Sequence, residues 1–227
     1  MERKEFLKQL GFGTFMAPVV IANNNSHDGE SLNACLESPR ETPGPFPTRD
    51  PAKLLTADIR GDRTGIEMTV RIAIQNKNDN CRALPGALVD IWHCDKDGYY
   101  SEYGGSGMQR VNLQSAHFLR GRQQADKNGL VSFTTIFPGW YRGRAPHIHV
   151  EIFDNSEKSL LITQIAFPTK ICDDVYTKAT QFYTSGRQDT SNESDGVFAN
   201  SLGSQMASVS GNIGNGFVLS NTIIVNA

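Results

Sequence analysis

The feature that most limits how this chain can fold is a strict alternation of apolar and polar side chains over residues 65–76. In this segment, GIEMTVRIAIQN, every second position from Ile66 to Ile74 is a large apolar residue, and most positions between them are polar or charged. Successive side chains on a β-strand point to opposite faces, so such a strand can bury one face and expose the other. The alternation therefore predicts a half-buried strand.

Five further segments have the composition of short strands separated by turns. The turn sequences Asp-Lys-Asp-Gly and Asp-Lys-Asn-Gly occur beside them, and the chain has no internal repeat. Helical periodicity is weak except over residues 173–183. Many short strands with few helices predict an all-β fold, either a sandwich or a barrel. The five segments are residues 87–94, 126–137, 147–154, 160–167 and 216–225.

The first 50 residues differ in composition from the rest of the chain. Residues 1–22 combine a basic start with an apolar stretch and are followed by a polar run, which is typical of a cleaved export signal. Residues 3–8, RKEFLK, resemble a twin-arginine signal with lysine in place of the second arginine; a short amphipathic helix is the alternative. Residues 23–50 are rich in Pro, Ser, Asn and Gly and predict an extended arm. We therefore expect an exported protein with a β-domain over residues 51–227.

The charge and the cysteines argue against several functions. The 227 residues have a formal net charge of −2, which gives no sign of nucleic-acid binding. No apolar run reaches the roughly 18–20 residues of a membrane-spanning helix, so we expect no integral membrane segment in the mature chain. The cysteines lack C-x-x-C spacing, which disfavours a thiolate zinc site, and disulfides between them could form with three different pairings. The cysteines are Cys35, Cys81, Cys94 and Cys172.

Two histidines on one predicted strand are the first candidates for chemistry. His147 and His149 in HIHVEI point to one face together with Glu151, while the apolar residues between them point to the other. Imidazole is a common metal ligand, but an isolated H-x-H pair is more often structural. Phenol oxygens could complete a site, although a single buried tyrosine is usually a packing residue. The tyrosines in question are Tyr141, after a Pro-Gly turn, and Tyr99, Tyr100 and Tyr103, after the first Asp-rich turn.

Four blocks of sequence together resemble the intradiol ring-cleavage dioxygenases, the family of catechol, protocatechuate and hydroxyquinol dioxygenases. In chain order they are GALVDIWHCDKDGYYS, DKNGLVSFTTIFPGWY, GRAPHIHVEI and LLITQ. The resemblance is closest to the exported, single-domain branch of the family. It implies a β-sandwich of mainly antiparallel strands with long loops, and the chain lacks the N-terminal helical dimerisation domain of catechol 1,2-dioxygenases. It also implies a mononuclear, non-haem Fe(III) cofactor.

The resemblance assigns the iron ligands to four residues. Its two tyrosine positions fall on Tyr100 and Tyr141, and its two histidine positions fall on His147 and His149. Phenolate is a hard anionic donor that suits Fe(III), and imidazole is a usual iron ligand. Free tyrosine has a pKa near 10, so coordination must stabilise its deprotonated form at neutral pH. In the family, Tyr141 and His149 correspond to axial ligands, and Tyr141 is the one that dissociates when substrate binds.

Two further residues match functional positions of the family. Arg144, shortly before the histidines, would stabilise negative charge on the substrate because its guanidinium stays protonated. Gln164, at the end of LLITQ, would add a hydrogen bond in the same place. The implied reaction inserts both atoms of O2 into a catechol-type aromatic diol and gives a muconate-type diacid. The implied partners are a small aromatic diol and O2.

Several alternatives stay open at the level of sequence. A β-sandwich can persist as a binding module without catalysis, and an H-x-H pair could serve a hydrolase or a zinc or copper enzyme. Only five residues separate Tyr141 from His147, which predicts a more open site and leaves the ring substituents of the substrate undetermined. A monomer and a homo-oligomer are equally compatible with the sequence. We expect the polar segment 190–196 and the Ser/Gly-rich segment 201–216 to be mobile loops.

Overall fold

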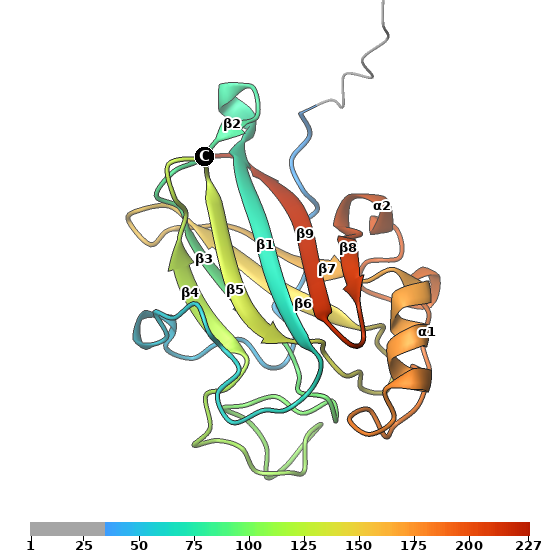
Figure 1. Ribbon diagram of the computed structural model, residues 1–227. Helices are drawn as coiled ribbons and strands as arrows, with labels where there is room; N and C mark the ends of the chain where they lie inside the picture. The colour runs from blue at the N-terminus through green and yellow to red at the C-terminus, as the bar shows by residue number, and fades with distance from the viewer. Residues whose placement is uncertain (1–34) are drawn as a thin grey trace, which may run out of the picture. The chain divides into compact units, whose positions relative to one another are not determined.

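Two β-sheets make up most of the folded chain. The computed structural model describes residues 35–227, so the export signal expected over residues 1–22 lies outside the described residues. The two sheets lie face to face (Figure 1). Buried apolar side chains from both sheets form one core cluster. The expected all-β sandwich is therefore confirmed, and no helical domain precedes the sheets within the described part of the chain.

The first sheet is built around the strand with the strict alternation. Met68, Val70, Ile72 and Ile74 have no exposed surface, which confirms the predicted buried face. Full burial of such a side chain contributes about 1.5–3 kcal/mol. The strands run in the order β2 (Arg82–Ala83), β1 (Glu67–Asn76), β9 (Gly216–Val225) and β8 (Ser208–Asn212), and β5 (Leu130–Ile136) also pairs with β1. The β1–β9 pair is parallel and the other pairs are antiparallel.

The second sheet carries the two candidate histidines. Its antiparallel strands run in the order β4 (Arg120–Gln124), β3 (Leu88–Trp92), β6 (His147–Phe153) and β7 (Ser159–Ala166). On β6, the side chains of Ile148, Val150 and Ile152 are buried in the core between the sheets. The register places His149 opposite Trp92 on one neighbouring strand and opposite Gln164 on the other. Three of the side chains that shape the candidate site thus lie side by side across the sheet.

The segment before the sheets runs without regular secondary structure from residue 35 to residue 50. Its backbone is fastened to both sheets, because the Ser38 amide donates to Ile224 (2.9 Å) and the Glu41 amide donates to Ile162 (2.8 Å). This path carries residues 42–46 past the face of β6 that bears the histidines. Both faces of β6 are therefore covered near its start, and His147 and His149 are buried.

The helices are short and lie outside the sheets. The helix expected over residues 173–183 is present as α1 (Thr169–Lys178), which starts earlier, directly after Pro168, and buries Cys172, Val175 and Tyr176. The other helical segments are α2 (Leu202–Gln205) and the 3-10 turns Pro51–Lys53, Lys77–Asp79 and Asn192–Ser194. No helix that the structure describes between residues 35 and 227 is long and apolar enough to cross a membrane.

Two segments that we expected to be mobile loops contain ordered structure. The segment 201–216 contains α2 and the edge strand β8, whose residues are mostly exposed and polar because only β9 pairs with it. The segment 190–196 contains Asn192 and Asp195, both of which are buried. The polar composition of both segments gave no signal of ordered structure, because an exposed edge strand lacks the alternation that marks a half-buried strand. The strand β4 was also missed, because it carries polar and charged residues.

The structure also decides which cysteines pair. Cys35 and Cys81 form a disulfide, with their Cα atoms 5.8 Å apart, which lies within the normal range for this bond. Cys94 and Cys172 are free and buried. The disulfide therefore joins the start of the described arm to the turn that follows β1.

Candidate metal centre

The four residues assigned as iron ligands lie together at one end of the second sheet. His147 and His149 come from β6, Tyr141 from the loop before β6, and Tyr100 from the loop after β3. The Nε2 atom of His147 lies 3.2 Å from the Tyr141 hydroxyl and 3.2 Å from Nε2 of His149. The Tyr100 ring lies with its centroid 5.8 Å from that of Tyr141 and 6.2 Å from that of His149. The rings of Tyr100 and His149, 49 residues apart in sequence, thus lie close together.

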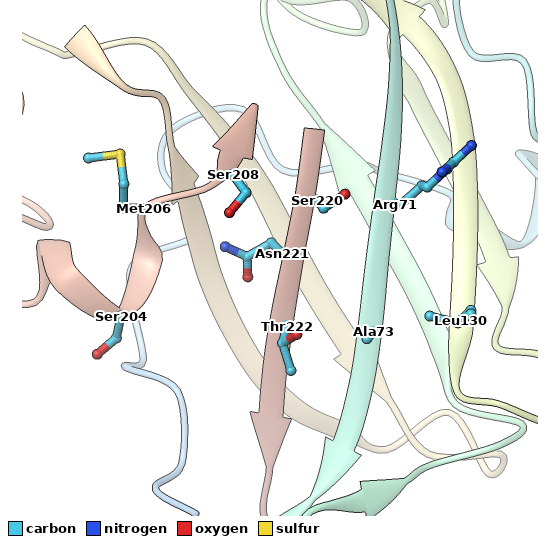
Figure 2. A pocket seen from close by; sticks show the side chains of 9 residues that line it. All are labelled: Arg71, Ala73, Leu130, Ser204, Met206, Ser208, Ser220, Asn221 and Thr222. Atoms are coloured by element: carbon cyan, nitrogen blue, oxygen red, sulfur yellow. The ribbon is translucent and has the colours of Figure 1, made fainter. Parts of the chain in front are cut away.

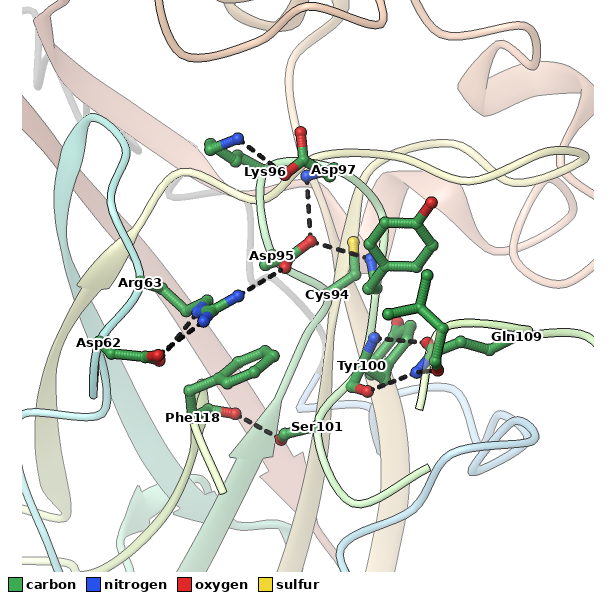
Figure 3. Close-up of polar contacts among 12 residues, drawn as sticks. Asp62, Arg63, Cys94, Asp95, Lys96, Asp97, Tyr100, Ser101, Gln109 and Phe118 are labelled. Atoms are coloured by element: carbon green, nitrogen blue, oxygen red, sulfur yellow. Dashed lines mark hydrogen bonds and ion pairs between the residues drawn. The ribbon is translucent and has the colours of Figure 1, made fainter. Parts of the chain in front are cut away.

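A network of hydrogen bonds fixes the backbone of Tyr100 (Figure 3). The Gln109 side chain accepts from the Tyr100 amide (2.7 Å) and donates to the Tyr100 carbonyl (2.8 Å). The next residue is also held, because the Ser101 hydroxyl donates to the Phe118 carbonyl (2.6 Å). The ring of Phe46 stacks on the Tyr100 ring at a centroid distance of 4.9 Å. Tyr100 therefore has one orientation, with its hydroxyl inside the protein.

The turn before Tyr100 is closed by Asp95. Its Oδ1 accepts from the amides of Asp97 (3.0 Å) and Tyr99 (2.9 Å), and its Oδ2 faces Arg63 at 3.4 Å (Figure 3). This turn points Tyr100 inward and leaves Tyr99 37 % exposed. The hydroxyl of Tyr103 donates to the Pro47 carbonyl (2.6 Å) and so is already engaged. Of the three neighbouring tyrosines, Tyr100 is the one whose ring packs near His149 and whose hydroxyl is buried without a hydrogen-bond partner among the described residues.

Neighbouring groups hold both histidine rings, and the orientation of His147 leaves a nitrogen lone pair facing the Tyr141 hydroxyl. The Nδ1 atom of His147 lies 2.6 Å from the Ala145 carbonyl and must carry the proton, which leaves Nε2 unprotonated. The His149 ring stacks parallel to Trp92 at 4.9 Å. On its other side lies the backbone of Gly44, where a Cβ atom would stand 3.0 Å from the imidazole Cε1. The arm and the sheet thus clamp His149 between them.

Burial strongly disfavours charge on all four groups. It lowers the pKa of His147 to about 3 and that of His149 well below its ordinary value. It also raises the pKa of Tyr100 well above its ordinary value and raises that of Tyr141. The protein alone therefore holds two neutral imidazoles and two neutral phenols here. A bound cation would reverse this preference for the phenols, because it stabilises phenolate directly.

The arrangement fits a single metal ion. The Tyr100 hydroxyl is buried and has no hydrogen-bond partner among the described residues, although such groups are normally satisfied. Two donor atoms bound at right angles about 2.1 Å from one ion would be about 3.0 Å apart, close to the 3.2 Å separations found here. Residues 35–227 contain no metal-competent cluster of three or more His, Cys, Asp or Glu side chains. The oxygen atoms found beside the two imidazoles belong to tyrosine side chains.

Glu151 and a further buried histidine, His93, form hydrogen bonds to other groups. Glu151, which shares the strand face of the histidines, accepts a hydrogen bond from the Ser159 hydroxyl (2.7 Å). His93 is buried, with Nδ1 2.8 Å from the Cys94 carbonyl and Nε2 2.7 Å from the Thr135 hydroxyl. Both nitrogens of His93 are thus satisfied, as expected for a structural histidine.

Arg144 and Gln164 lie directly beside the cluster. One terminal nitrogen of Arg144 is 3.4 Å from both the Tyr141 hydroxyl and Nε2 of His147. The other terminal nitrogen donates to the Gln164 side-chain oxygen (2.5 Å), and the Gln164 amide donates to the Thr42 carbonyl (3.0 Å). The guanidinium therefore borders the same space as the four donor atoms.

Sequence reasoning missed two parts of this site. The arm residues Thr42, Gly44 and Phe46 contact Gln164, His149 and Tyr100, although a Pro/Gly-rich segment carries no signal of such contacts. Asp195 forms an ion pair with Arg144 at 2.9 Å, although it lies in a stretch that appeared to be an exposed polar loop. No local pattern could have found Asp195, because its partner is 51 residues away.

A cavity of about 260 Å³ opens beside Tyr141. Aromatic and apolar side chains supply much of its lining, and Arg142 adds a positive charge at its rim; they include Phe46, Tyr99, Met108, Trp140 and Tyr141. A larger hollow of about 430 Å³ lies on the outer face of the first sheet (Figure 2). Its lining includes Arg71, Ser220 and Thr222 and none of the site residues predicted from the sequence. Of these two hollows, the cavity beside Tyr141 is the one that a residue of the cluster lines.

The fold and the donor set together define a class, that of β-sandwich proteins with a candidate metal centre of two phenols and two imidazoles. The chain belongs to the intradiol ring-cleavage dioxygenase family, since a family model described as "Dioxygenase" matches residues 41–207. It is 29 % identical to an intradiol ring-cleavage dioxygenase from Tetranychus urticae, with a TM-score of 0.75 over 85 % of this chain and 95 % of that one.

Two further comparisons are more distant. The chain is 28 % identical over 160 residues to a chlorocatechol 1,2-dioxygenase from Rhodococcus opacus, which covers 61 % of this chain and 57 % of that protein. It thus spans little more than half the length of this curated relative. The structure of 3-chlorocatechol 1,2-dioxygenase from Rhodococcus opacus 1CP matches with a TM-score of 0.56 at 20 % identity, over 89 % of this chain and 78 % of that one. This last likeness concerns the fold.

Proposed function

We propose that this protein is an intradiol dioxygenase that binds one Fe(III) ion through Tyr100, Tyr141, His147 and His149. It would insert both atoms of O2 into a catechol-type diol, breaking the ring bond between the two hydroxylated carbons to give a muconate-type diacid. The observation that carries the proposal is the buried cluster of two phenols and two imidazoles, with the Tyr100 hydroxyl left without a partner. Bound Fe(III) would supply Lewis acidity, favouring the diolate and making the ring reactive towards O2.

The two tyrosines differ in a way that suggests different roles. Tyr100 is fully buried, and Gln109 holds both its amide and its carbonyl, so we expect this ligand to stay bound during the reaction. Tyr141 lines the cavity and is partly exposed. If Tyr141 bound iron as a phenolate, its oxygen would therefore be free to turn away from the centre and to take up a proton from the incoming diol as a neutral phenol. The Arg144 guanidinium lies 3.4 Å from this hydroxyl and would donate a hydrogen bond to the Tyr141 oxygen.

Arg144 is placed to stabilise charge on the substrate. Its terminal nitrogen borders the space between Tyr141 and His147, where a diol entering from the cavity would lie. Positioned donors act on charge that develops during reaction, and the permanent charge of guanidinium strengthens this effect. Gln164 holds the other terminal nitrogen, so that the guanidinium plane stays directed towards the centre.

The cavity has room for more than an unsubstituted ring. A cavity of about 150 Å³ is enough to bind benzene, whereas the cavity beside Tyr141 measures about 260 Å³. Its aromatic walls suit a planar aromatic ligand. We therefore include catechols that carry a ring substituent among the substrates.

An exported location is part of the proposal. The Cys35–Cys81 disulfide supports it, because disulfides persist mainly in proteins outside the reducing cytosol. The basic and apolar start of the sequence supports it as well. The order of export and iron loading could be followed by measuring the iron content of cytoplasmic and exported protein.

The test of the proposed function is a visible absorption spectrum of the iron-loaded protein, recorded before and after catechol is added without O2. We expect a charge-transfer band from tyrosinate on Fe(III), and we expect catechol to shift it. Admission of ¹⁸O₂ should then give a diacid that carries two labelled oxygens. A colourless protein with one iron per chain would contradict the ligand assignment. A shifted band without O2 uptake would instead indicate a binding module.

Replacing Gly44 by alanine should weaken iron binding through His149. Gly44 has φ +69°, and a Cβ atom there would press on the imidazole at 3.0 Å. We expect about a 10- to 100-fold loss of iron affinity, as is usual when the support of a metal ligand is disturbed. Gly107→Ala is the matched control, because Gly107 has a similar φ of +64° but open space around its Cα. Equal iron affinities in the two variants would show that backbone strain, and not the contact with His149, controls the effect.

A further inference from the structure

Asp195 is a buried carboxylate whose two oxygens accept hydrogen bonds from residues 144–145, just before β6, and from its own loop. It has no exposed surface. Its two oxygens accept from Nε of Arg144 at 2.9 and 3.1 Å, and one of them also accepts from the Ala145 amide at 2.8 Å. The other oxygen accepts from the Val197 amide at 2.9 Å. Asp195 therefore ties the chain around residue 196 to the segment that leads into β6.

These contacts determine how the Arg144 guanidinium can point. Because Nε is held by Asp195 and the guanidinium is planar and rigid, this contact restricts the directions in which the two terminal nitrogens can point. One of them donates to Gln164, and the other lies 3.4 Å from the Tyr141 hydroxyl and from Nε2 of His147. Without the carboxylate, the arginine side chain would keep one short hydrogen bond, to Gln164, the two long contacts of 3.4 Å, and the face of the Phe198 ring at 5.6 Å. The direction of the guanidinium thus depends on a residue that does not itself reach the centre.

The Asp195 carboxylate also compensates the positive charge of the Arg144 guanidinium. The Arg144 side chain is only 14 % exposed, and an unpaired charge in such surroundings is costly. Burial works against ionisation of Asp195, but hydrogen bonds from Arg144 and from two backbone amides hold its pKa below the ordinary value. Asp195 therefore remains a carboxylate beside the guanidinium.

We propose that Asp195 is the positioning residue of this site: it orients the Arg144 guanidinium towards the space between Tyr141 and His147, where the substrate reacts. The proposal rests on the proposed dioxygenase function for its catalytic consequence. Its geometric content, that Asp195 immobilises Arg144, does not depend on iron or on turnover.

The catalytic consequence is tested with a double-mutant cycle in the iron-loaded full chain. Wild type, Asp195→Asn, Arg144→Ala and the double variant are compared for kcat and KM with catechol, and for iron content. Asp195→Asn should lower kcat about 10- to 100-fold, the usual effect of losing a group that orients a site residue, while KM and iron content change less. Arg144→Ala should lower kcat by about 100-fold or more. The double variant should be no slower than Arg144→Ala, because Asp195 acts through Arg144.

Asp189→Asn is the matched control for this cycle. Asp189 lies six residues before Asp195 and accepts a hydrogen bond from the Gly143 amide (3.1 Å), but it forms no ion pair with Arg144 among the described residues. We expect Asp189→Asn to keep wild-type kcat. A loss as large as that of Asp195→Asn would indicate that any disturbance of this loop slows the enzyme, and it would overturn the proposal. So would losses that multiply in the double variant.

A second measurement follows the geometry without iron or substrate. The Nε–H proton of Arg144, assigned by its absence from Arg144→Ala, should exchange slowly with solvent in ¹H–¹⁵N spectra of wild type, and this protection should be lost in Asp195→Asn. Protection that persists in Asp195→Asn overturns the proposal even if wild type turns over catechol. Loss of protection in a protein that never cleaves catechol would instead refute the dioxygenase function alone.

If Asp195→Asn does not fold, Arg144→Lys tests the same contact. Lysine keeps the positive charge but has one nitrogen, which cannot span Asp195 and Gln164 at once. We expect Arg144→Lys to lose nearly as much kcat as Arg144→Ala. Near-wild-type activity would mean that charge alone suffices and that orientation by Asp195 is dispensable.

Discussion

Tyr100→Phe is expected to make the iron-free protein at least as stable as wild type while abolishing iron binding and turnover. The Tyr100 hydroxyl is buried and unpartnered among the residues described, so its removal relieves an unfavourable desolvation of about 1–3 kcal/mol. The aromatic ring, which supplies the contacts with Phe46, is unchanged. Stability and function should therefore move in opposite directions, as is typical where a site is kept for function.

The expected loss of iron affinity exceeds about 100-fold, since groups that merely support a ligand already contribute 10- to 100-fold. The measurements are iron content, the tyrosinate charge-transfer band and the urea midpoint of the iron-free protein. His149→Ala and Tyr141→Phe should likewise abolish turnover. Retention of the band and of turnover by Tyr100→Phe would refute its assignment as a ligand.

Tyr103→Phe is the matched control for this experiment. Its hydroxyl donates to the Pro47 carbonyl at 2.6 Å and does not face the histidines. Loss of this bond should lower the free energy of unfolding by about 0.5–1.5 kcal/mol and leave iron content unchanged. The two variants therefore differ in the sign of the stability change as well as in iron binding.

Removing the Cys35–Cys81 disulfide is expected to lower the free energy of unfolding by about 4 kcal/mol. The bond closes a loop with a sequence separation of 46 residues, for which loop-closure entropy in the unfolded chain gives about this value. Because domains are stable by only about 5–15 kcal/mol, this is a large share of the total. Denaturation by urea of Cys35→Ser/Cys81→Ser, and of wild type with and without dithiothreitol, measures it.

The disulfide should also influence the metal centre. It anchors the start of the arm that carries Thr42, Gly44 and Phe46 to Gln164, His149 and Tyr100. The double serine variant should therefore bind iron more weakly in its folded state. Cys172→Ala is the control, because this buried thiol is in no disulfide and its removal should leave sensitivity to dithiothreitol intact. An unchanged midpoint after reduction, verified by thiol titration, would contradict the prediction.

The strands of the core were predictable from sequence because their pattern is local. The alternation along β1 and β6 and the apolar runs of β3 and β7 reflect burial of one or both faces of each strand, and the corresponding elements appear where expected. The polar strands β4 and β8 carry no such pattern and were missed. The predicted start of α1, residue 173, lies four residues after its actual start at Thr169, because the signal at this start is a single proline after a strand.

The sequence by itself determined the all-β class, the face of β6 that bears His147 and His149, and the residue types available for a metal. These properties follow from side-chain alternation and from chemistry that each residue carries with it. The resemblance had already selected Tyr100 over its neighbours, and tertiary structure showed its ring beside His149 and the Tyr103 hydroxyl bonded to Pro47. Tertiary structure alone decided that Cys35 pairs with Cys81 and that Asp195 holds Arg144. Each of these depends on contacts between segments tens of residues apart, whose distances are set only when the sheets, the arm and the loops pack together.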